Sequence, residues 1–412
     1  MVRSTFFPTC FVVLAVALSH FCMHADIHDN RFFPLINPHP LTYEPDTPSY
    51  LVAQGAFSWA DRSYNMFGQE VQLPAIFGSY DLKDIVNAYV ALGNQNPLPA
   101  SLQDVEIPFV VTGSMQAQGC SLLYHQTISP QWSCGLALYF LRLDQTYRFI
   151  LTKKDIFTEA QEADIDEQRR LLYQRLGFYS GDHAHITGIG DIDLYVRFTH
   201  SCPYFLRCTR TQHMFQLGAL IPTGKEQSPF VAPSLPFGGN GHPGIYCAIK
   251  HYFELKEDLL IGVEAQCSKR FEQTDCLRVG TCNIPPLYGV TTQQMTVDPG
   301  VTAHFSPFII LSNVRQGLGL HLRYTVKVHD KDTFSTTSSL PFIVNTAAHR
   351  QLSEWTAEYV TLGFFYDFSK VKPVRSFEPT FYLTWDIPSS AIFKPKRVYK
   401  TYTLSLGCEF VF

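Results

Sequence analysis

The chain ends with the stretch Tyr402-Thr-Leu-Ser-Leu-Gly-Cys-Glu-Phe-Val-Phe412. Side chains of an extended strand point alternately to its two faces, so this stretch has one apolar and one polar face. The polar face carries Thr403, Ser405, Gly407 and Glu409, with Val411 as an apolar exception. The apolar face carries Tyr402, Leu404, Leu406, Cys408, Phe410 and Phe412. A half-buried strand of a soluble sheet has the same alternation, so the pattern by itself predicts only an amphipathic strand.

The terminal phenylalanine makes the stretch more specific. An apolar alternation that closes on a final phenylalanine resembles the C-terminal signature of bacterial outer-membrane β-barrels. The resemblance implies that the barrel-assembly machinery is a partner of the chain. The expected assembly signal consists of Tyr402, Leu404, Leu406, Phe410 and Phe412. A secreted soluble β protein is the alternative.

Composition narrows the class of protein. The chain has 412 residues, enough for one large β domain or two ordinary ones, and its net charge of −4 offers no basic field for nucleic acid. Aromatic residues make up 14%, which suits a barrel with aromatic girdles, and charged residues only 17%. After the signal-like N-terminus no uncharged apolar run approaches the ~18 residues of a membrane helix. Membrane-like composition without membrane helices favours a closed barrel.

The N-terminal part divides into two segments. Residues 1–25 predict a secretory signal peptide, with Arg3 as its positive start, residues 10–18 as its apolar core and Ala25 as the cleavage point. Residues 26–48 are proline-rich and without periodicity. We expect them to form a periplasmic tail, with a plug inside the lumen as the alternative. Residues 49–412 are the expected barrel.

The alternation of the C-terminus recurs along the chain. Each run is about as long as a tilted membrane strand requires, roughly 9–11 residues. The repetition predicts an all-β, transmembrane antiparallel barrel of about 12 strands, with a range of 12–14. Whether the weakly alternating residues 50–59 form the first strand stays open. The clearest runs are 192–198, 212–221, 245–254, 259–268, 318–328, 377–387 and 402–412, and the less regular ones are 50–59, 105–126, 133–143, 301–311 and 354–368.

The connections between these runs alternate between short and long. Counted back from Phe412, the expected periplasmic turns are short: 128–131, 200–208, 256–258, 312–316 and 369–376. Four of the five expected outside loops are long, and the five are 152–185, 223–242, 270–296, 329–353 and 388–396. Outer-membrane barrels have short turns on one side and long loops on the other. We therefore expect a bacterial outer-membrane location with both termini periplasmic.

Two segments have helical patterns. Residues 81–92 form an apolar stripe that ends before Gly93, which predicts a short helix in a plug or a loop. Residues 159–176 lie inside a long loop, where Thr158 and Gln161 match a capping box. This second helix is either a lid over the barrel mouth or a solvated loop helix.

Two short motifs suggest a family. Thr187-Gly-Ile-Gly-Asp-Ile192 begins one strand, and Leu217-Gly-Ala-Leu-Ile-Pro-Thr-Gly224 ends the next. The pair resembles the outer-membrane proteins grouped with phenol-degradation meta-pathway transporters, which are similar to long-chain fatty-acid transporter barrels. The resemblance implies a channel or passive transporter for small solutes, hydrophobic ones included, and no enzyme. A purely structural role in strands and turns is compatible with it. The motif residues are Gly188, Gly190, Asp191, Pro222, Thr223 and Gly224.

The polar faces of the expected strands carry charges of both signs. Such a mixture predicts no strong ion selectivity, and paired charges could also fill a narrow barrel. The candidate lumen residues are Arg197, Lys250, Glu264, Arg323, Lys327 and Glu378, with Asp386 on the same face.

Other functions remain as alternatives. His304 and Ser306 share a strand face in a His-x-Ser arrangement that resembles outer-membrane phospholipases. A serine nucleophile needs a base that a third group orients, and no orienting Asn or Asp stands nearby in sequence. A structural or adhesive barrel without an open pore is the other alternative. In every case outer-membrane lipid is an expected partner.

The cysteines and histidines suggest no cofactor. Cys202 with Cys208, and Cys276 with Cys282, could form local disulfides in an oxidising compartment. His200 beside Cys202 and Cys208 matches no strong zinc spacing. We therefore expect no metal and no other cofactor.

Overall fold

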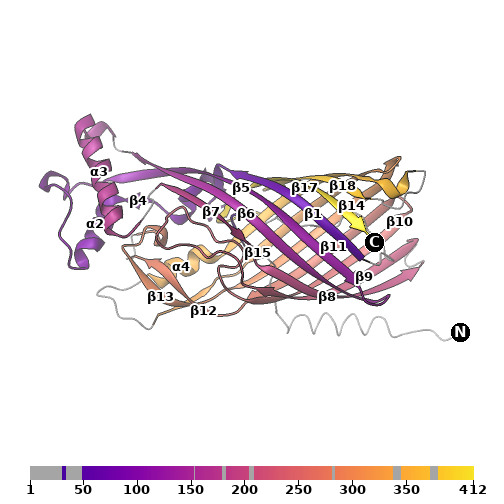
Figure 1. Ribbon diagram of the computed structural model, residues 1–412. Helices are drawn as coiled ribbons and strands as arrows, with labels where there is room; N and C mark the ends of the chain where they lie inside the picture. Colours follow the sequence, from indigo (N-terminus) through magenta and orange to yellow (C-terminus); the bar gives the residue numbers. More distant parts are fainter. Residues whose placement is uncertain are drawn as a thin grey trace.

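A computed structural model describes residues 30–33, 49–152, 154–178, 182–203, 208–280, 284–336, 345–371 and 379–412. The expected signal peptide, most of residues 26–48 and Glu378 lie outside these ranges. The described chain forms a closed antiparallel β-barrel, with loops and helices gathered at one of its ends (Figure 1).

A wall of 12 strands closes the barrel. Every wall strand pairs with the next one along the chain, and β1 (Ser49–Ala60) pairs with β20 (Tyr402–Val411) to complete the ring. The predicted fold class is confirmed, and residues 50–59 belong to the first strand. The other wall strands are β5 (Pro108–Thr127), β6 (Trp132–Leu151), β8 (Ile192–Pro203), β9 (Arg210–Ile221), β10 (Gly244–Lys256), β11 (Leu259–Arg270), β14 (Val301–Arg315), β15 (Leu318–His329), β17 (Trp355–Asp367) and β18 (Thr380–Pro388).

Strand β20 shows why these residues form a barrel wall. Ser405 and Glu409 face the interior and are 1% and 3% exposed, whereas Leu404 and Leu406 face outward and are 43% and 64% exposed. Apolar side chains also cover the outer faces of the other strands, and large exposed ones include Val196, Leu217, Ile261, Phe305, Leu322, Phe364 and Leu383. An apolar exterior around a polar interior is the pattern of a strand wall surrounded by hydrocarbon.

Aromatic side chains flank this apolar band. Near one rim, Trp59 stacks on Tyr402 with ring centroids 5.6 Å apart. Near the other rim, Tyr124 lies 6.4 Å from Phe412, and Trp132 lies 5.1 Å from Phe198. Aromatic side chains are enriched at both membrane interfaces, because one end of the side chain is apolar and the other end tolerates water.

The two ends of the barrel differ. At the end that holds the C-terminus (Figure 1), which we call the turn end, four of the five connections have two to six residues and the fifth has 12. They are residues 128–131, 204–209, 257–258, 316–317 and 368–379. At the opposite end, the loop end, the connections are long. In chain order, loops 1 to 6 are residues 61–107, 152–191, 222–243, 271–300, 330–354 and 389–401.

Three helices lie in these loops. Helix α2 (Leu82–Ala91) begins where the Asp81 carboxylate accepts a hydrogen bond from Lys83 N at 2.9 Å. Helix α3 (Glu159–Arg175) begins at a complete capping box formed by Thr158 and Gln161. Both were predicted. Helix α4 (Thr346–Ser353) was not, because its eight residues contain only one large apolar side chain, Leu352, and so show no apolar stripe in the sequence. Among the described residues, no helix is long and apolar enough to cross a membrane.

Short strands and 3-10 turns complete the loop end. They form two small sheets, β12–β13–β16 and β19–β2–β3, while β4 and β7 extend the wall beside β5 and β6. These segments of two to eight residues are too short to show a clear alternation. Their bounds are β2 (Arg62–Tyr64), β3 (Glu70–Gln72), β4 (Tyr80–Asp81), β7 (His183–Ile189), β12 (Gln273–Val279), β13 (Thr291–Asp298), β16 (Thr333–Ser335) and β19 (Val398–Tyr399), with 3-10 turns at η1 (Leu73–Phe77), η2 (Ala100–Leu102), η3 (Lys154–Ile156), η4 (Pro286–Tyr288) and η5 (Phe368–Lys370).

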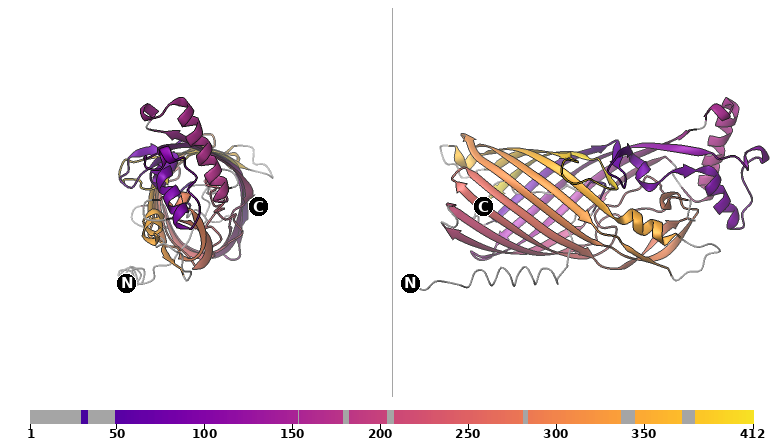
Figure 2. Two further views of the ribbon diagram at one scale, coloured as in Figure 1. Left: turned by 90° about the vertical axis from the view of Figure 1, so that its left-hand side faces the viewer. Right: turned by 180° about the vertical axis from the view of Figure 1, so that it is seen from behind.

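A buried aromatic cluster joins several loops into one body. Tyr80 of loop 1 lies 5.1 Å from Tyr288 of loop 4 and 6.1 Å from Tyr173 of α3, measured between ring centroids. Phe149 of β6 lies 5.6 Å from Tyr173. Such edge-to-face pairs each contribute ~0.5–1.5 kcal/mol beyond the burial of their area. Loops 1, 2 and 4 therefore form a packed structure over the barrel mouth (Figure 2).

The Cys202–Cys208 disulfide considered from the sequence is not formed. Cys202 has a free thiol, and its Sγ lies 3.2 Å from His200 Nε2. Cys282, the second member of the other suggested pair, lies outside the described residues.

Candidate functional site: the barrel interior and a pocket at the loop end

Ion pairs on the interior face of the wall join β10, β11 and β15. The register places Lys250 directly opposite Glu264, and Lys250 Nζ lies 2.8 Å from Glu264 Oε1. Arg323 of β15 lies 3.3 Å from the other carboxylate oxygen of Glu264. All three side chains are at most 15% exposed. A buried carboxylate shared by two cations keeps its charge compensated, which a narrow polar interior requires.

A second polar group surrounds Arg197. Its guanidinium donates to Gln216 Oε1 at 3.1 and 3.2 Å and to the Tyr50 hydroxyl of β1 at 3.4 Å. Tyr246 OH donates to the Asp193 carboxylate at 3.0 Å. Hydrogen-bonded side chains from several strands therefore occupy part of the interior.

The structure shows where most of the predicted lumen residues lie. Lys327 is 1% exposed and is on the interior face of β15, like Arg323. Arg197, Lys250 and Glu264 face the interior as described above, and Glu378 lies outside the described residues. That these side chains influence the passage of a solute stays a prediction.

The two sequence motifs meet at the buried carboxylate of Asp191, which is 0% exposed. Gly224 N donates to Asp191 Oδ1 at 3.0 Å, Gly239 N donates to Oδ2 at 2.9 Å, and Arg270 Nη1 lies 2.6 Å from Oδ2. Thr223 Oγ1 also donates to Gly190 O at 2.8 Å. The aspartate thus attaches both ends of loop 3 to the end of β11.

The close approach explains one motif glycine. A Cβ on Gly224 would lie 1.9 Å from the Phe237 carbonyl oxygen and 2.6 Å from Asp191 Oδ1. Only a residue without a side chain fits there. Pro222 follows directly after β9, where the chain leaves the wall. Gly188 lies in β7, and it is not part of this hydrogen-bonded group.

The described N-terminal residues lie at the loop end, inside the protein. Phe32 and Phe33 are each 4% exposed, with ring centroids 4.8 Å from Tyr399 and 6.3 Å from Phe237, respectively. The Asn30 amide donates to Pro236 O at 2.8 Å. Tyr399 N donates to Arg31 O at 3.1 Å. Residues 30–33 are therefore bound by loops 3 and 6, although the next described residue, Ser49, begins β1 at the turn end.

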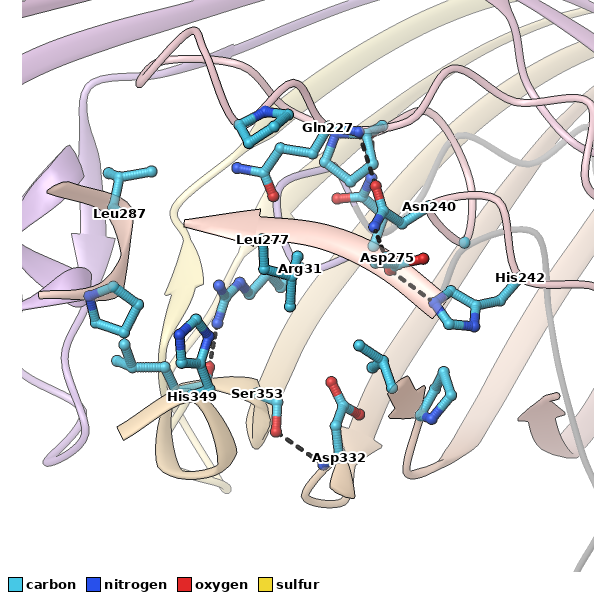
Figure 3. A pocket seen from close by; sticks show the side chains of 18 of the residues that line it. Arg31, Gln227, Asn240, His242, Asp275, Leu277, Leu287, Asp332, His349 and Ser353 are labelled. Carbon is cyan, nitrogen blue, oxygen red and sulfur yellow. Dashed lines mark hydrogen bonds and ion pairs between the residues drawn. The ribbon is translucent and has the colours of Figure 1, made fainter. Parts of the chain in front are cut away.

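A pocket of about 260 Å³ opens beside this segment, between loops 3, 4 and 5 (Figure 3). Most of its wall is apolar, and a few polar side chains converge on it. On one side, Asp275 accepts hydrogen bonds from His242 Nε2 at 3.0 Å and Asn240 Nδ2 at 3.1 Å. Its lining includes Arg31, Phe32, Phe77, Val231, Leu277, Leu287, Val297, His349, Leu352 and Trp355.

Burial and hydrogen bonding set the charges in this pocket. Burial lowers the pKa of His242, but hydrogen bonds to Asp275 and to the Phe271 carbonyl more than offset it, so its pKa lies above the ordinary value. Burial lowers the pKa of His349 to about 4 and that of Arg31 to about 10. At neutral pH the pocket therefore has a neutral His349 and a cationic Arg31, whose guanidinium donates to the Leu352 carbonyl.

His304 and Ser306 do form a hydrogen-bonded pair. His304 Nε2 lies 2.6 Å from Ser306 Oγ, and Thr325 Oγ1 lies 2.7 Å from the same oxygen. The two residues are 6% and 0% exposed and face the barrel interior. The pair therefore lies away from the lipid-facing surface where a membrane phospholipid would be presented.

One comparison with solved structures finds a similar fold. No family model matches the chain, and no curated protein matches it. The crystal structure of an outer membrane channel from Pseudomonas putida F1 is similar with a TM-score of 0.50 and 9% identity, over 92% of this chain and 100% of that one. The transport unit of the autotransporter AIDA-I from Escherichia coli matches at a TM-score of 0.38 with 7% identity, over 91% and 93% of the two chains. The Pseudomonas putida toluene transporter TodX matches at 0.31 with 9% identity, over 94% and 95%.

Proposed function

We propose that the protein is an outer-membrane channel for the passive uptake of small hydrophobic solutes. The pocket at the loop end is the observation that carries this proposal. It is a mostly apolar cavity at the mouth of a closed barrel, and its few polar groups converge on one side. The outer membrane channel of similar fold supports the same class of function.

The orientation follows from the lengths of the connections. Outer-membrane barrels have short periplasmic turns and longer outside loops. The loop end then faces outward, and the turn end, with the C-terminus, faces the periplasm. In this orientation the pocket is open to solutes from outside, and Tyr402, Leu404, Leu406, Phe410 and Phe412 form the periplasmic signal for the barrel-assembly machinery.

For residues 26–48 we propose the plug, which was the alternative to the expected periplasmic tail. Thr401, whose hydroxyl donates to Phe32 O, directly precedes β20, so Phe32 lies near the loop-end rim. Ser49 lies at the other rim, about ten residues along β1 and so roughly 35 Å away. The 15 intervening residues, 34–48, can span up to ~50 Å. A path through the lumen is therefore long enough, and it would narrow the channel.

The alternatives are less well supported. A phospholipase would need His304 and Ser306 at the lipid-facing surface, but both face the interior. We therefore propose no phospholipase activity for this pair. A structural or adhesive barrel without an open pore makes no use of the apolar pocket.

Trp355 provides the test, because it lines the pocket and is 3% exposed. We replace Trp59, Trp132 and Trp385 with Phe and titrate the folded barrel in detergent with a brominated short-chain alcohol. Bromine quenches tryptophan on contact, so saturable quenching of Trp355 is expected if the pocket accepts a hydrophobic solute. A variant that keeps only Trp59, on the outer wall, should show only the linear quenching of a micelle-bound side chain.

The contradictory outcome is equally clear. If Trp355 shows only the linear quenching seen for Trp59, the pocket takes no hydrophobic solute. A second replacement tests the same site, because Leu277→Gln adds a polar group to the pocket wall. It should weaken saturable binding by roughly tenfold, since a site of this kind discriminates by about 1–3 kcal/mol per mismatched group.

A further inference from the structure

Two neighbouring turns at the loop end display large apolar side chains. In loop 1, Met66 and Phe67 are 50% and 65% exposed, and in loop 6, Ile392 and Phe393 are 69% and 51% exposed. The turns touch, because a Cβ on Gly68 would lie 3.1 Å from Lys394 Cβ. Four exposed side chains of this size on two touching turns form an apolar surface, which marks an interaction site when it is not covered.

Polar side chains hold both turns in shape. The Glu358 carboxylate is 1% exposed and accepts from the backbone N–H groups of Ala391, Ile392 and Phe393 at 2.9, 3.2 and 2.8 Å. The Asn65 side chain accepts from Phe67 N at 2.8 Å and Gln69 N at 3.1 Å. The apolar side chains are thus presented by ordered turns, so little conformational entropy is lost when they bind something.

The loop 6 turn lies on the outer surface of the barrel. Strand β18 ends at Pro388, opposite Tyr359, and the chain returns to the wall where Lys396 pairs with Thr356. Residues 389–395 therefore bulge out of the wall. Along β17, Ala357 and Tyr359 face the interior, whereas Glu358 shares the outer face with Leu362 and Phe364. Because Glu358 binds the amides of the bulge, the bulge lies on that outer face.

The position of Glu358 along β17 places the bulge at the loop-end edge of the apolar band. Tyr366 lies on the same face eight residues from Glu358, near the turn end. At ~3.3 Å per residue and a tilt of ~40°, the two are roughly 20 Å apart along the barrel axis, close to the ~25 Å height of an apolar band. Ile392 and Phe393 therefore extend the lipid-facing surface toward the loop end.

Cations adjoin the patch. Lys394 is exposed and Lys396 is partly exposed, and neither makes an ion pair with any of the described residues. The neighbouring cations are already engaged, because Arg397 pairs with Glu354 and Lys400 pairs with Glu70. The surface thus combines a rigid apolar patch with two uncompensated ammonium groups at the proposed boundary between hydrocarbon and headgroups.

We propose that this surface binds a phosphorylated glycolipid of the outer leaflet. Its acyl chains pack against Ile392, Phe393, Met66 and Phe67, and Lys394 and Lys396 bind its phosphate. The assignment rests on the proposed orientation, with the loop end outward. Two features favour acyl chains over a second copy of the protein as the occupant. The patch continues the lipid-facing band, and its lysines would face the same lysines of the other copy across a symmetric interface and repel them.

The test measures lipid binding by the folded full-length protein in detergent. A bis-phosphorylated lipid A is added to the barrel, and the temperature at which the folded, fast-migrating band disappears is recorded. We expect this temperature to rise saturably with lipid A and not with its dephosphorylated form. The double variant Lys394→Ala/Lys396→Ala should raise the apparent dissociation constant by roughly tenfold to thirtyfold, since each lysine contributes roughly threefold to fivefold at an anionic lipid surface.

Matched controls are available at the turn end. Lys256 is an exposed lysine there, and Ile128 and Val314 are exposed apolar residues, 67% and 57%. Lys256→Ala should leave the dissociation constant for lipid A unchanged. The double variant Ile392→Ser/Phe393→Ser should raise this constant, whereas its control, Ile128→Ser/Val314→Ser, should not. The heat-sensitive band itself shows that each variant is folded.

Two results would overturn the proposal. One is equal stabilisation by the dephosphorylated lipid, and the other is an unchanged dissociation constant in the lysine double variant. A lipid-independent dimer that Ile392→Ser/Phe393→Ser abolishes would identify a protein interface in its place. None of these results depends on the pocket, so solute quenching of Trp355 tests the channel separately.

Discussion

At the scale of single residues, the loop end depends on buried polar groups whose partners are distant in sequence. His242 donates to Asp275, Glu358 accepts three backbone amides, and Asp191 accepts two amides beside a guanidinium. Each group is almost fully buried, so the loss of one partner leaves a desolvated polar atom. Such losses cost more than the hydrogen bond itself contributes. The side chains that hold the loops in place are therefore sensitive to small changes.

His242 makes the stability of the pocket depend on pH. Its pKa in the folded protein lies above the value of about 6.5 that it has in an unfolded chain, because of Asp275 and the Phe271 carbonyl. A raised pKa stabilises the fold fully below the unfolded value, and the contribution is lost as pH rises through the folded value. We expect hydrogen exchange of residues 271–280 to be slower at pH 5.5 than at pH 8.5, after correction for the intrinsic rate.

The variant His242→Phe isolates this effect. It keeps the ring volume and removes the titrating group, so the corrected exchange rates of residues 271–280 should become the same at the two pH values. If the pH dependence persists in His242→Phe, another group is responsible. His349 serves as a comparison, because burial lowers its pKa to about 4 and it stays neutral across this range.

At the scale of elements, loop 3 illustrates how an irregular segment is held in place. It has no helix or strand among residues 222–243, and its attachment to the barrel comes from Asp191, Arg270 and the amides of Gly224 and Gly239. The wall strands β8 and β9, in contrast, are held by a continuous ladder from Ile192 to Pro203. The loop should therefore unfold separately from the wall.

Asp191→Asn tests that separation. The amide can accept one of the two backbone N–H groups, but it removes the charge that Asp191 presents to the buried Arg270, at a cost of ~3–5 kcal/mol. We expect fast hydrogen exchange and protease cleavage in residues 225–240, with the heat-dependent gel shift of the barrel unchanged. Asp193→Asn, on the same strand, should leave residues 225–240 protected. Loss of the gel shift in Asp191→Asn would show that loop 3 and the wall unfold as one unit.

At the scale of the whole molecule, a closed wall encloses a crowded interior. The Lys250–Glu264–Arg323 group lies within the wall, and the described N-terminal residues fill space at its loop end. A barrel of this size has room for few side chains in addition to a path for solute. Whether the path is open should therefore depend on the N-terminal segment.

Deletion of residues 26–48, with the signal segment retained, tests the plug. We expect the folded variant to show a larger single-channel conductance than the full chain in a planar bilayer, because the narrowing segment is gone. The matched control replaces residues 34–48 with a Gly/Ser segment of equal length, which keeps residues 30–33 in place and should raise conductance less. An unchanged conductance in the deletion variant would mean that these residues leave the permeation path free.

Local patterns were sufficient for the barrel wall. The alternation of residues 402–412 and its repetition predicted the strands, because a strand between lipid and a polar interior must change polarity at every residue. Helices α2 and α3 were predictable from an apolar stripe and from a capping box. The sorting of connections into short and long sets was equally visible, since it depends only on where the alternation stops.

Tertiary structure alone decided the site. Three features join residues that are 32 or more positions apart in the sequence. They are the contacts of Asp191 with Gly224, Gly239 and Arg270, the position of residues 30–33 at the loop end, and the bulge that Glu358 holds. No local periodicity encodes such pairs, because they satisfy individual buried donors and acceptors in loops without regular structure. The wall follows from a repeated local rule imposed by the membrane, whereas the pocket follows from hydrogen bonds that exist only once the wall has brought its loops together.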